Sequence, residues 1–292
     1  MGSDLQIAPK SPQVVSGRRA QVIRPACSAS HVLVDGVRSL VQSAGLLRAM
    51  TVTRLKMRYR YSLLGWGWAL LQPLSLTVVY SLIFSRSTSD KIDSLPYTLF
   101  VFAGLTPWAF CSTAISTAVA GILNHRTLMA TVYFPREIIP ISFVAASLVD
   151  FVIAVVMLLL MMFCYSIPIS VNVLFALPIL SILMVLVVAF CLLLSSIQVR
   201  IRDISIALPL ILQVLVFAAP IVYPASAVPL AFRSLYWLNP FAILIQSFRD
   251  AVVGGRIPLV GDLLYCVAMA ITCFVISYLI FKKIEPTIVD DM

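Results

Sequence analysis

The sequence predicts an all-α, polytopic membrane protein with six transmembrane helices. Hydrophobic residues make up 61% of the 292 positions and charged residues only 11%, whereas soluble domains contain about 25% charged residues. Residues 151–199 contain no charged side chain. About 20 residues of helix cross a hydrocarbon core about 30 Å thick, so this stretch alone must hold two spans. These observations exclude an ordinary soluble domain.

Two segments precede the first span. Residues 1–35 are rich in Ser, Pro, Gln, Val and Arg. No apolar segment follows their first charges, so we expect a disordered cytoplasmic tail rather than a cleaved signal peptide. Residues 36–65 carry apolar side chains at helical spacing among several arginines and lysines. Because these charges are too many to cross a bilayer, we expect an interfacial amphipathic helix on the inner leaflet.

Between Arg58 and Pro73 the chain is expected to pass from the membrane surface into the hydrocarbon core. Arginines and tyrosines come first, then Trp66 and Trp68, then leucines. This is the order in which a helix meets headgroups, interface and hydrocarbon. The transmembrane domain is therefore expected to cover residues 66–283.

Long apolar segments predict the six spans within that domain: about 66–84, 97–123, 138–165, 172–199, 206–223 and 263–281. Four prolines punctuate residues 224–262. The uncharged piece 234–248 reaches about 22 Å as a helix, too short to cross. We expect short re-entrant helices there on the outer side, although a seventh span would result if this piece did cross. Residues 284–292 form a short tail.

Basic residues predict the orientation. Six spans place both termini on one side. With the termini in the cytoplasm, 16 of the 21 lysines and arginines fall in cytoplasmic segments, which are enriched in these residues in membrane proteins. The formal net charge of +9 thus reflects topology rather than a surface for nucleic acid.

Motifs for enzyme chemistry are missing from the sequence. No glycine precedes a lysine, so no Walker A loop can hold nucleotide phosphates. The two histidines, His31 and His125, are too few for a multi-histidine metal site, and the six cysteines form no disulfide framework. We expect no catalytic residue, no metal and no cofactor on this chain, and hence no enzyme.

Asp150 is the one ionisable group deep in a predicted span. Such residues often relay protons or contact substrate, which would suit a secondary transporter. A structural acid, hydrogen-bonded to Ser, Thr or backbone near a helix contact, is the other interpretation. We favour it because the other predicted spans offer no partner base.

Two predicted cytoplasmic loops are candidates for contacts with a partner protein. In the first, Pro135 stops one helix and begins the next. A short helix held across the ends of two spans can transmit a movement of a cytosolic partner to those spans. An ordinary linker would look similar. The second is a tight charged turn. The candidate residues are Asn124, His125, Arg126, Phe134, Pro135, Arg136 and Glu137 in the first loop and Arg200, Arg202 and Asp203 in the second.

Aromatic residues gather towards the outer half of the predicted spans. Anchoring at the membrane interface explains many of them, and a path for sugar rings is the functional alternative. The residues are Trp108, Phe110, Phe217, Tyr223, Phe232, Tyr236, Trp237 and Phe241.

The order of several short motifs resembles one family. The motifs are Arg58-Tyr-Arg-Tyr-Ser-Leu-Leu-Gly-Trp-Gly-Trp-Ala-Leu-Leu-Gln-Pro73, Phe134-Pro-Arg-Glu-Ile138, Val199-Arg-Ile-Arg-Asp-Ile204, Ala219-Pro-Ile-Val-Tyr223 and Leu238-Asn-Pro-Phe241. Over about residues 38–283 the chain resembles ABC-2 type permeases that export O-antigen, teichoic acid and related lipid-linked polysaccharides.

This resemblance implies a homodimer with two copies of a separate cytosolic ATP-binding subunit, which would hold ATP and Mg. It further implies a bacterial inner-membrane location and a role in lipopolysaccharide biosynthesis. Residues 124–133 look like a first coupling helix, the Arg200–Asp203 turn like a second cytosolic contact, and residues 224–245 like outer gate helices. Trp108, Phe217, Tyr223, Tyr236, Trp237 and Phe241 would belong to the channel or its gate.

The resemblance also implies a site where a lipid-linked substrate enters, before the first span. A lipid pyrophosphate is an anion at headgroup depth, and arginine suits phosphate oxygens. We therefore assign Arg58, Arg60, Gly65 and Trp66 to this site, although binding of anionic bilayer lipids would explain the arginines as well.

The leading hypothesis from the sequence is a permease subunit of an ATP-driven exporter of lipid-linked polysaccharide. Three alternatives stay open: an ABC-2 exporter of a drug or lipid, a secondary transporter that uses Asp150, and a membrane scaffold for a glycan-synthesis enzyme.

Overall fold

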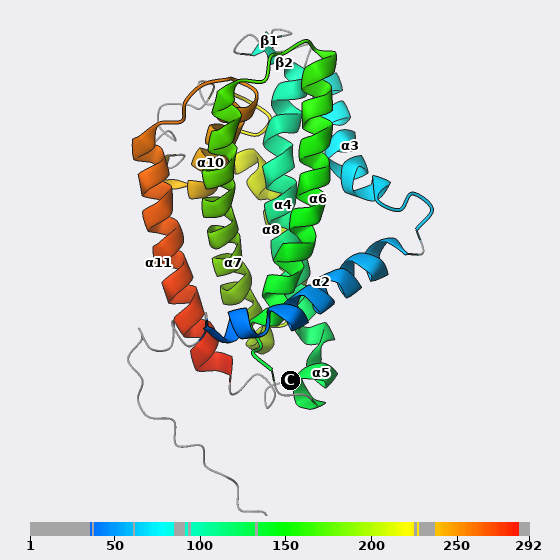
Figure 1. The fold of residues 1–292 in the computed structure, drawn as a ribbon, viewed down its shortest axis with the longest axis vertical. Coiled ribbons are helices and arrows are strands. Elements are labelled where there is room, and N and C mark those ends of the chain that lie inside the picture. The colour runs from blue at the N-terminus through cyan, green and yellow to red at the C-terminus, as the bar shows by residue number, and fades with distance from the viewer. Residues whose placement is uncertain are drawn as a thin grey trace, which may run out of the picture.

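The computed structural model shows a bundle of long helices (Figure 1). It describes residues 36, 38–60, 62–84, 91–92, 95–131, 134–224, 227 and 237–285. The predicted tail 1–35 lies outside the described residues. So do residues 286–292 and most of the segment 225–236, where re-entrant helices are expected.

Among the described residues, five helices are long and apolar enough to cross a membrane. They are α3 (Gly67–Phe84), α4 (Tyr97–Asn124), α6 (Ile138–Cys164), α7 (Ala176–Arg200) and α11 (Val260–Ile284). A 3-10 helix, η1 (Val171–Phe175), continues directly into α7. Each long helix overlaps a predicted span, and the all-α fold class is confirmed.

The remaining predicted span, residues 206–223, corresponds to a shorter helix. α8 (Ile204–Ala218) is apolar but has only 15 residues, about 22 Å of helix. Residues 219–222 then leave the helix and are buried, because Pro220 cannot supply the amide hydrogen that a helix needs. A total of six spans therefore stays a prediction.

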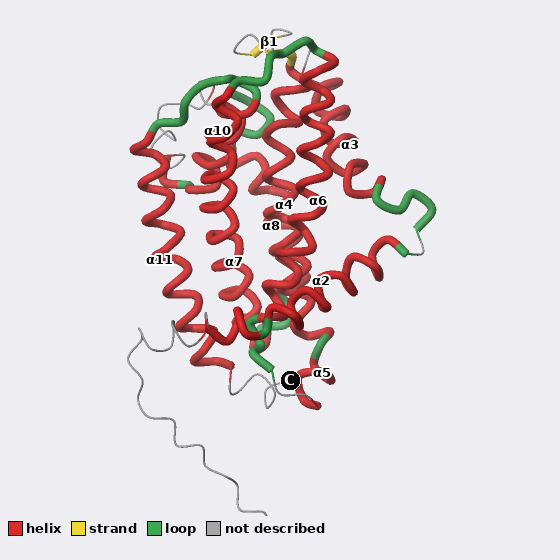
Figure 2. The backbone as a smooth tube through the Cα atoms, viewed as in Figure 1, coloured by secondary structure: helices red, strands yellow, loops and turns green. Residues whose placement is uncertain are grey.

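The connections gather at two ends of the bundle (Figures 1 and 2). One end, called here the α5 end, holds α5 (Arg126–Thr131), the turn between α7 and α8, and the last turn of α11. The opposite end holds η1, α10 (Pro240–Val252) and a small hairpin of β1 (Lys91–Ile92) with β2 (Leu95–Pro96). This grouping matches the predicted division of the connections into two sides.

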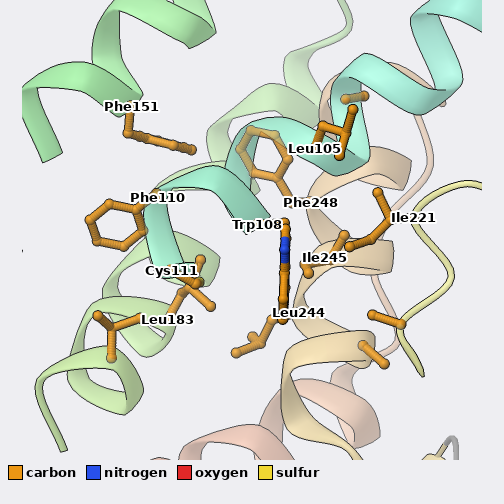
Figure 3. Packing of buried hydrophobic residues seen from close by; sticks show 14 of the residues in the cluster. Leu105, Trp108, Phe110, Cys111, Phe151, Leu183, Ile221, Leu244, Ile245 and Phe248 are labelled. Carbon is orange, nitrogen blue, oxygen red and sulfur yellow. The ribbon is translucent and has the colours of Figure 1, made fainter. Parts of the chain in front are cut away.

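Helix α4 is the centre of the fold. It packs against α3, α6, α7, α8 and α10, and most of its residues are buried. Figure 3 shows Trp108 and Phe110 of α4 beside Phe151 of α6, Leu183 of α7 and Phe248 of α10. The hydrophobic core therefore surrounds α4, and only one face of this helix remains for other contacts.

Helix α2 (Ala44–Tyr59) runs obliquely across α6. Residues 36 and 38–42 before it are also helical. The predicted amphipathic segment 36–65 is therefore helical over most of its length, up to Tyr59, where the chain turns before α3. Gly65 adopts a φ of +50° in this turn, a left-handed conformation that glycine takes without strain. Residues 62–66 project from the bundle (Figure 2).

Candidate functional site

Two adjoining cavities lie between the membrane helices. One has a volume of about 450 Å³ and the other about 520 Å³. Both are lined by Arg58, Gln72, Pro73, Ser75, Ala109 and Thr113. Helices α2 and α6 complete the first cavity, and α8 completes the second. The two cavities together are called the groove below.

Helix α4 presents a polar face to the groove. Ser112, Thr113, Ser116 and Thr117 line the second cavity, and residues four apart lie on one face of a helix. The Ser116 hydroxyl donates to the Ser112 carbonyl at 2.7 Å, and the Thr117 hydroxyl donates to the Thr113 carbonyl at 2.6 Å. Their oxygen lone pairs therefore remain able to accept hydrogen bonds from a molecule in the groove.

Sequence reasoning missed this face. The signal was the pair of Ser-Thr doublets four residues apart, Ser112-Thr113 and Ser116-Thr117. Isolated hydroxyls are tolerated in any membrane helix when they bond back to the backbone. A few of them therefore do not distinguish a groove-lining helix from other spans in a hydropathy average.

The other walls add amide and hydroxyl groups. Gln72 and Ser75 come from α3, Ser147 from α6 and Gln213 from α8. An amide both donates and accepts hydrogen bonds. The groove can therefore hydrogen-bond a polar, uncharged chain inside an otherwise apolar bundle.

One ion pair lies in the groove. Arg58 Nη1 is 2.5 Å from Asp150 Oδ2, and the Tyr59 hydroxyl donates to Asp150 Oδ1 at 2.5 Å. Burial raises the pKa of Tyr59, and the hydrogen bond to Asp150 raises it further, so this hydroxyl keeps its proton. Among the described residues that line the groove, Arg58 and Asp150 are the only charged side chains.

Asp150 therefore has a charged partner, contrary to the favoured expectation that it bonds to Ser, Thr or backbone. The expectation considered only bases within other spans, whereas Arg58 belongs to α2. Asp150 also lies 12 residues after Ile138, about 18 Å along α6, so Arg58 is beside the middle of α6 rather than at its end.

The other residues of the predicted substrate-entrance site lie around the end of α2. Trp66 stacks on Tyr59 with ring centroids 4.5 Å apart and remains half exposed. Arg60 caps α2 and is exposed. Gly65 forms the turn described above. Of the four, only Arg58 lines the groove.

Only some of the predicted channel aromatics lie at the groove. Trp108 lines the second cavity, and Phe217 contacts Tyr80 of its lining edge-on at 6.2 Å. Tyr223 donates a hydrogen bond to the Phe217 carbonyl. Phe241 instead packs on Phe190, with centroids 5.4 Å apart, and lines neither cavity. Trp237, three residues before α10, is exposed. Phe110 lines the first cavity, and Phe232 and Tyr236 lie outside the described residues.

At the α5 end, the Phe134-Pro-Arg-Glu137 segment is attached to α11. Glu137 is fully buried, and Lys282 Nζ lies 3.0 Å from its carboxylate. Tyr278 donates to the same carboxylate at 3.4 Å, and Arg136 donates to the backbone carbonyl of Glu285. Glu137 thus positions this loop and presents no charge to a partner.

The other predicted coupling residues face outward or support the loop. Phe134 is buried and Pro135 half-buried, whereas Asn124, Arg200, Arg202 and Asp203 are exposed. The side chain of Arg126, at the start of α5, lies outside the description. The Gln198 amide bonds to the Arg202 carbonyl and the Ser205 amide hydrogen, which fixes the turn that carries these charges.

His125 connects α5 with the neighbouring helices. Its Nδ1 lies 2.7 Å from the Gly121 carbonyl, and its ring meets Phe143 of α6 edge-on at 6.0 Å. Arg54 of α2 also contacts Phe143, with its guanidinium carbon 3.4 Å from the centre of the Phe143 ring. Arg54 also donates to Ser142 at 2.8 Å. Burial lowers the pKa of Arg54 to about 10.

Residues 45–253, more than half of the chain, match the family described as ABC-2 type transporter. The chain belongs to the ABC-2 type transporter family. An "O-antigen export system permease protein RfbA" of Myxococcus xanthus is 32% identical over 250 residues, which cover 85% of this chain and 95% of the relative. A protein of the same description from Klebsiella pneumoniae is 28% identical over 243 residues, 82% of this chain and 92% of its own.

A "Polysialic acid transport protein KpsM" of Escherichia coli is 22% identical over 242 residues, covering 82% of this chain and 93% of the relative. As an ABC-2 type transporter, this chain is a multi-pass membrane protein of a transport system. The groove is then its candidate transport surface, and the exposed charges of the α5 end are candidates for contact with a partner.

Proposed function

We propose that this chain is the permease subunit of an ATP-driven exporter that moves a lipid-linked, O-antigen-like polysaccharide from the cytoplasm across the bacterial inner membrane. The observation that carries the proposal is the groove, in which hydroxyl and amide groups line a path between membrane helices. Sugar chains carry many hydroxyl groups, and each needs a hydrogen-bond partner when it leaves water.

The relatives support a glycan as the transported molecule. Two are named for O-antigen export and one for polysialic acid transport. A drug or a lipid would need an apolar path instead, and the doublets of α4 would then face the wrong kind of molecule.

A homodimer would close the groove. Helix α3 buries only Pro73 and Thr77 of its 18 residues, and α8 exposes Ile206, Leu210, Ile211 and Val214. Both helices line the groove, so a second copy packed on these apolar faces would enclose it between two subunits.

ATP hydrolysis is assigned to a separate cytosolic subunit, present in two copies, which would bind ATP and Mg. The exposed charges of the α7–α8 turn and the short helix α5 lie at one end of the bundle, where one partner could contact both. This assignment places the α5 end and both termini in the cytoplasm.

Export is tested by deleting the gene and extracting lipid-linked glycan from the cells. We expect finished polymer to accumulate on its lipid carrier inside the cell and to be missing from the surface. Normal surface glycan without accumulation would contradict polysaccharide export and favour a drug or lipid as the transported molecule.

The groove is tested by complementing that strain with variants. Ser116→Ala/Thr117→Val removes two hydroxyls from the groove and should reduce surface glycan. Ser181→Ala removes an exposed hydroxyl of α7 that lines neither cavity, and should export normally. Equal export by the two variants would contradict a transport path along α4.

A further inference from the structure

Asp150 occupies the place on Arg58 that an anionic substrate group would need. We propose that Asp150 is an internal substitute for a phosphate group, which it yields when a phosphate or pyrophosphate on a membrane-embedded carrier binds Arg58. This exchange rests on the proposed function, because it describes how the substrate carrier would engage the groove.

The geometry leaves Arg58 able to exchange. Its side chain is 41% exposed and lines both cavities, whereas Asp150 lines only the first and is 15% exposed. The short ion pair involves Nη1, and a guanidinium carries five N–H donors in a planar fork that matches phosphate oxygens. A phosphate group in the groove can therefore reach Arg58 from the side that Asp150 does not cover.

Arg58 has an anionic partner both before and after the exchange. Arg58 lies beside the middle of α6, where an unpaired charge is costly. Asp150 neutralises it in the structure, and a phosphate would neutralise it after the exchange. The displaced Asp150 carboxylate still has a hydrogen-bond donor, because Tyr59 donates to Oδ1 whereas Arg58 contacts Oδ2. Tyr59 can therefore keep its hydrogen bond when Arg58 leaves.

The exchange would also loosen a wall of the groove. Arg58 and Tyr59 end α2, and the chain continues through the turn at Gly65 into α3. Helix α3 is held weakly, with two of its 18 residues buried. Trp66, stacked on Tyr59, connects the turn to the ion pair. Separating Arg58 from Asp150 removes one of the two bonds that hold the end of α2 beside α6, and the Tyr59 bond remains, so the turn before α3 is held less firmly.

Binding of a probe to the purified full-length chain in zwitterionic nanodiscs tests the exchange. Farnesyl pyrophosphate supplies the headgroup without a glycan. Asp150→Asn keeps the shape of the side chain and frees Arg58, so we expect it to bind the probe about five- to tenfold more tightly than the native chain. Arg58→Gln should lose binding, and Asp262→Asn, which removes an acid that lines neither cavity, should bind as the native chain does.

The exchange predicts opposite changes in probe affinity for Asp150→Asn and Arg58→Gln. If Asp150 only holds α2 against α6, both variants loosen the same contact and probe binding falls in both, which would overturn the exchange. Tyr59→Phe provides a second check. It leaves Asp150 without a donor once Arg58 departs, so probe binding should be weaker than native, and native-like binding would contradict the proposal.

Competition identifies the source of the phosphate. Phosphatidylglycerol added to the nanodiscs displaces the probe if the site accepts any lipid phosphodiester, and fails to displace it if a pyrophosphate carrier is required. Either result supports the exchange, whereas no probe binding to the native chain or to Asp150→Asn overturns it. The assay involves neither ATP nor export, so a chain that exports glycan but binds no probe refutes the exchange alone. A chain that binds the probe but causes no glycan accumulation when deleted refutes the export function alone.

Discussion

Glu137 and Lys282 form an ion pair that joins two distant parts of the chain. The carboxylate has no exposed surface, and the lysine side chain is 21% exposed. Removing one member of a buried pair leaves the other charge uncompensated and destabilises a protein by about 3–5 kcal/mol. This pair therefore anchors the Phe134-Pro-Arg-Glu137 loop to the last turn of α11.

Lys282→Met should lower the midpoint of thermal unfolding in detergent markedly, with a loss of stability of about 3–5 kcal/mol. The neighbouring Lys283 is exposed, so Lys283→Met changes the net charge equally without touching Glu137. The two variants are compared by fluorescence-detected unfolding. Similar midpoints would show that the ion pair adds little.

His125 should make stability sensitive to acid. Burial lowers its pKa below the ordinary 6.5, and Arg54 nearby lowers it further, while the Gly121 carbonyl acts in the opposite direction. Between the lowered pKa and 6.5, the unfolded chain binds more protons than the folded chain, so stability falls as the pH falls through this window.

His125→Asn removes the titrating group. Unfolding midpoints measured from pH 7.5 to pH 5 should fall more steeply for the native chain than for this variant. Parallel curves would mean that other groups account for any acid sensitivity.

Single residues with a role were only partly predictable. Arg58 and Asp150 each stood out, but they are 92 positions apart, and nothing in a linear pattern brings an interfacial helix beside the middle of a particular span. Glu137 was recognised within a loop motif, yet its partner Lys282 is 145 positions away and looked like a positive charge at the end of the last span.

At the scale of elements, α4 and α6 approach closely at Gly121. A Cβ atom built there would lie 1.9 Å from Phe143 Cε2, so any larger residue forces the ring or a helix to move. The same ring lies against Arg54 and His125. Glycine thus lets α2, α4 and α6 meet at one aromatic side chain.

Gly121→Ala should destabilise the protein by about 1–3 kcal/mol, as overpacking of a close contact does. Gly45→Ala is the matched control, because a Cβ at Gly45 in α2 meets nothing within 4 Å and alanine favours the helix by about 0.5–1 kcal/mol. The measurement is the unfolding midpoint of each variant, and equal midpoints would disprove the close approach.

The helices themselves were largely predictable, because an uncharged apolar run must hide its backbone polar groups in a helix when it crosses a bilayer. Their ends were predicted where charges or prolines interrupt the run, as at Asn124 and Arg200. Helix α8 was predicted too long, because residues 219–222 are as apolar as the helix before them. Residues 219–222 are buried, and Arg249 of α10 donates a hydrogen bond to the Pro220 carbonyl. A sequence pattern does not specify such distant neighbours.

At the scale of the whole molecule, the distribution of charge makes a prediction about orientation. Arg202 is exposed in the α7–α8 turn at the α5 end. Ile257 is exposed in the connection between α10 and α11, whose Gly255 carbonyl accepts a hydrogen bond from Asn172 of η1 at the opposite end. In a background without the six native cysteines, Ile257→Cys should react with a membrane-impermeant maleimide in intact spheroplasts. Arg202→Cys should react only after the membrane is permeabilised, and the reverse pattern would invert the proposed topology.

The arrangement of the helices was less predictable than the positions of the long apolar helices. Hydropathy identifies segments that can cross but not which of them lies at the centre, since α4 and the peripheral α3 have the same mean hydropathy of 1.5. Their surroundings differ greatly: 78% of the α4 window is buried in the protein, against 11% for α3. The groove arises between these two helices, so its lining could not be assembled from the sequence alone.

The central position of α4 has a consequence for biogenesis. Among the described spans, α3 and α4 are synthesised first and are the least apolar, whereas α6 and α7 follow with mean hydropathies of 2.7 and 3.0. Helix α4 therefore leaves the ribosome before most of the helices that will cover it. Until they arrive, the Ser116 and Thr117 hydroxyls stay satisfied by carbonyls of α4 itself, so this helix can wait in the membrane for its partners. The core of this transporter therefore forms only after α6 and α7 have been made and can pack around α4.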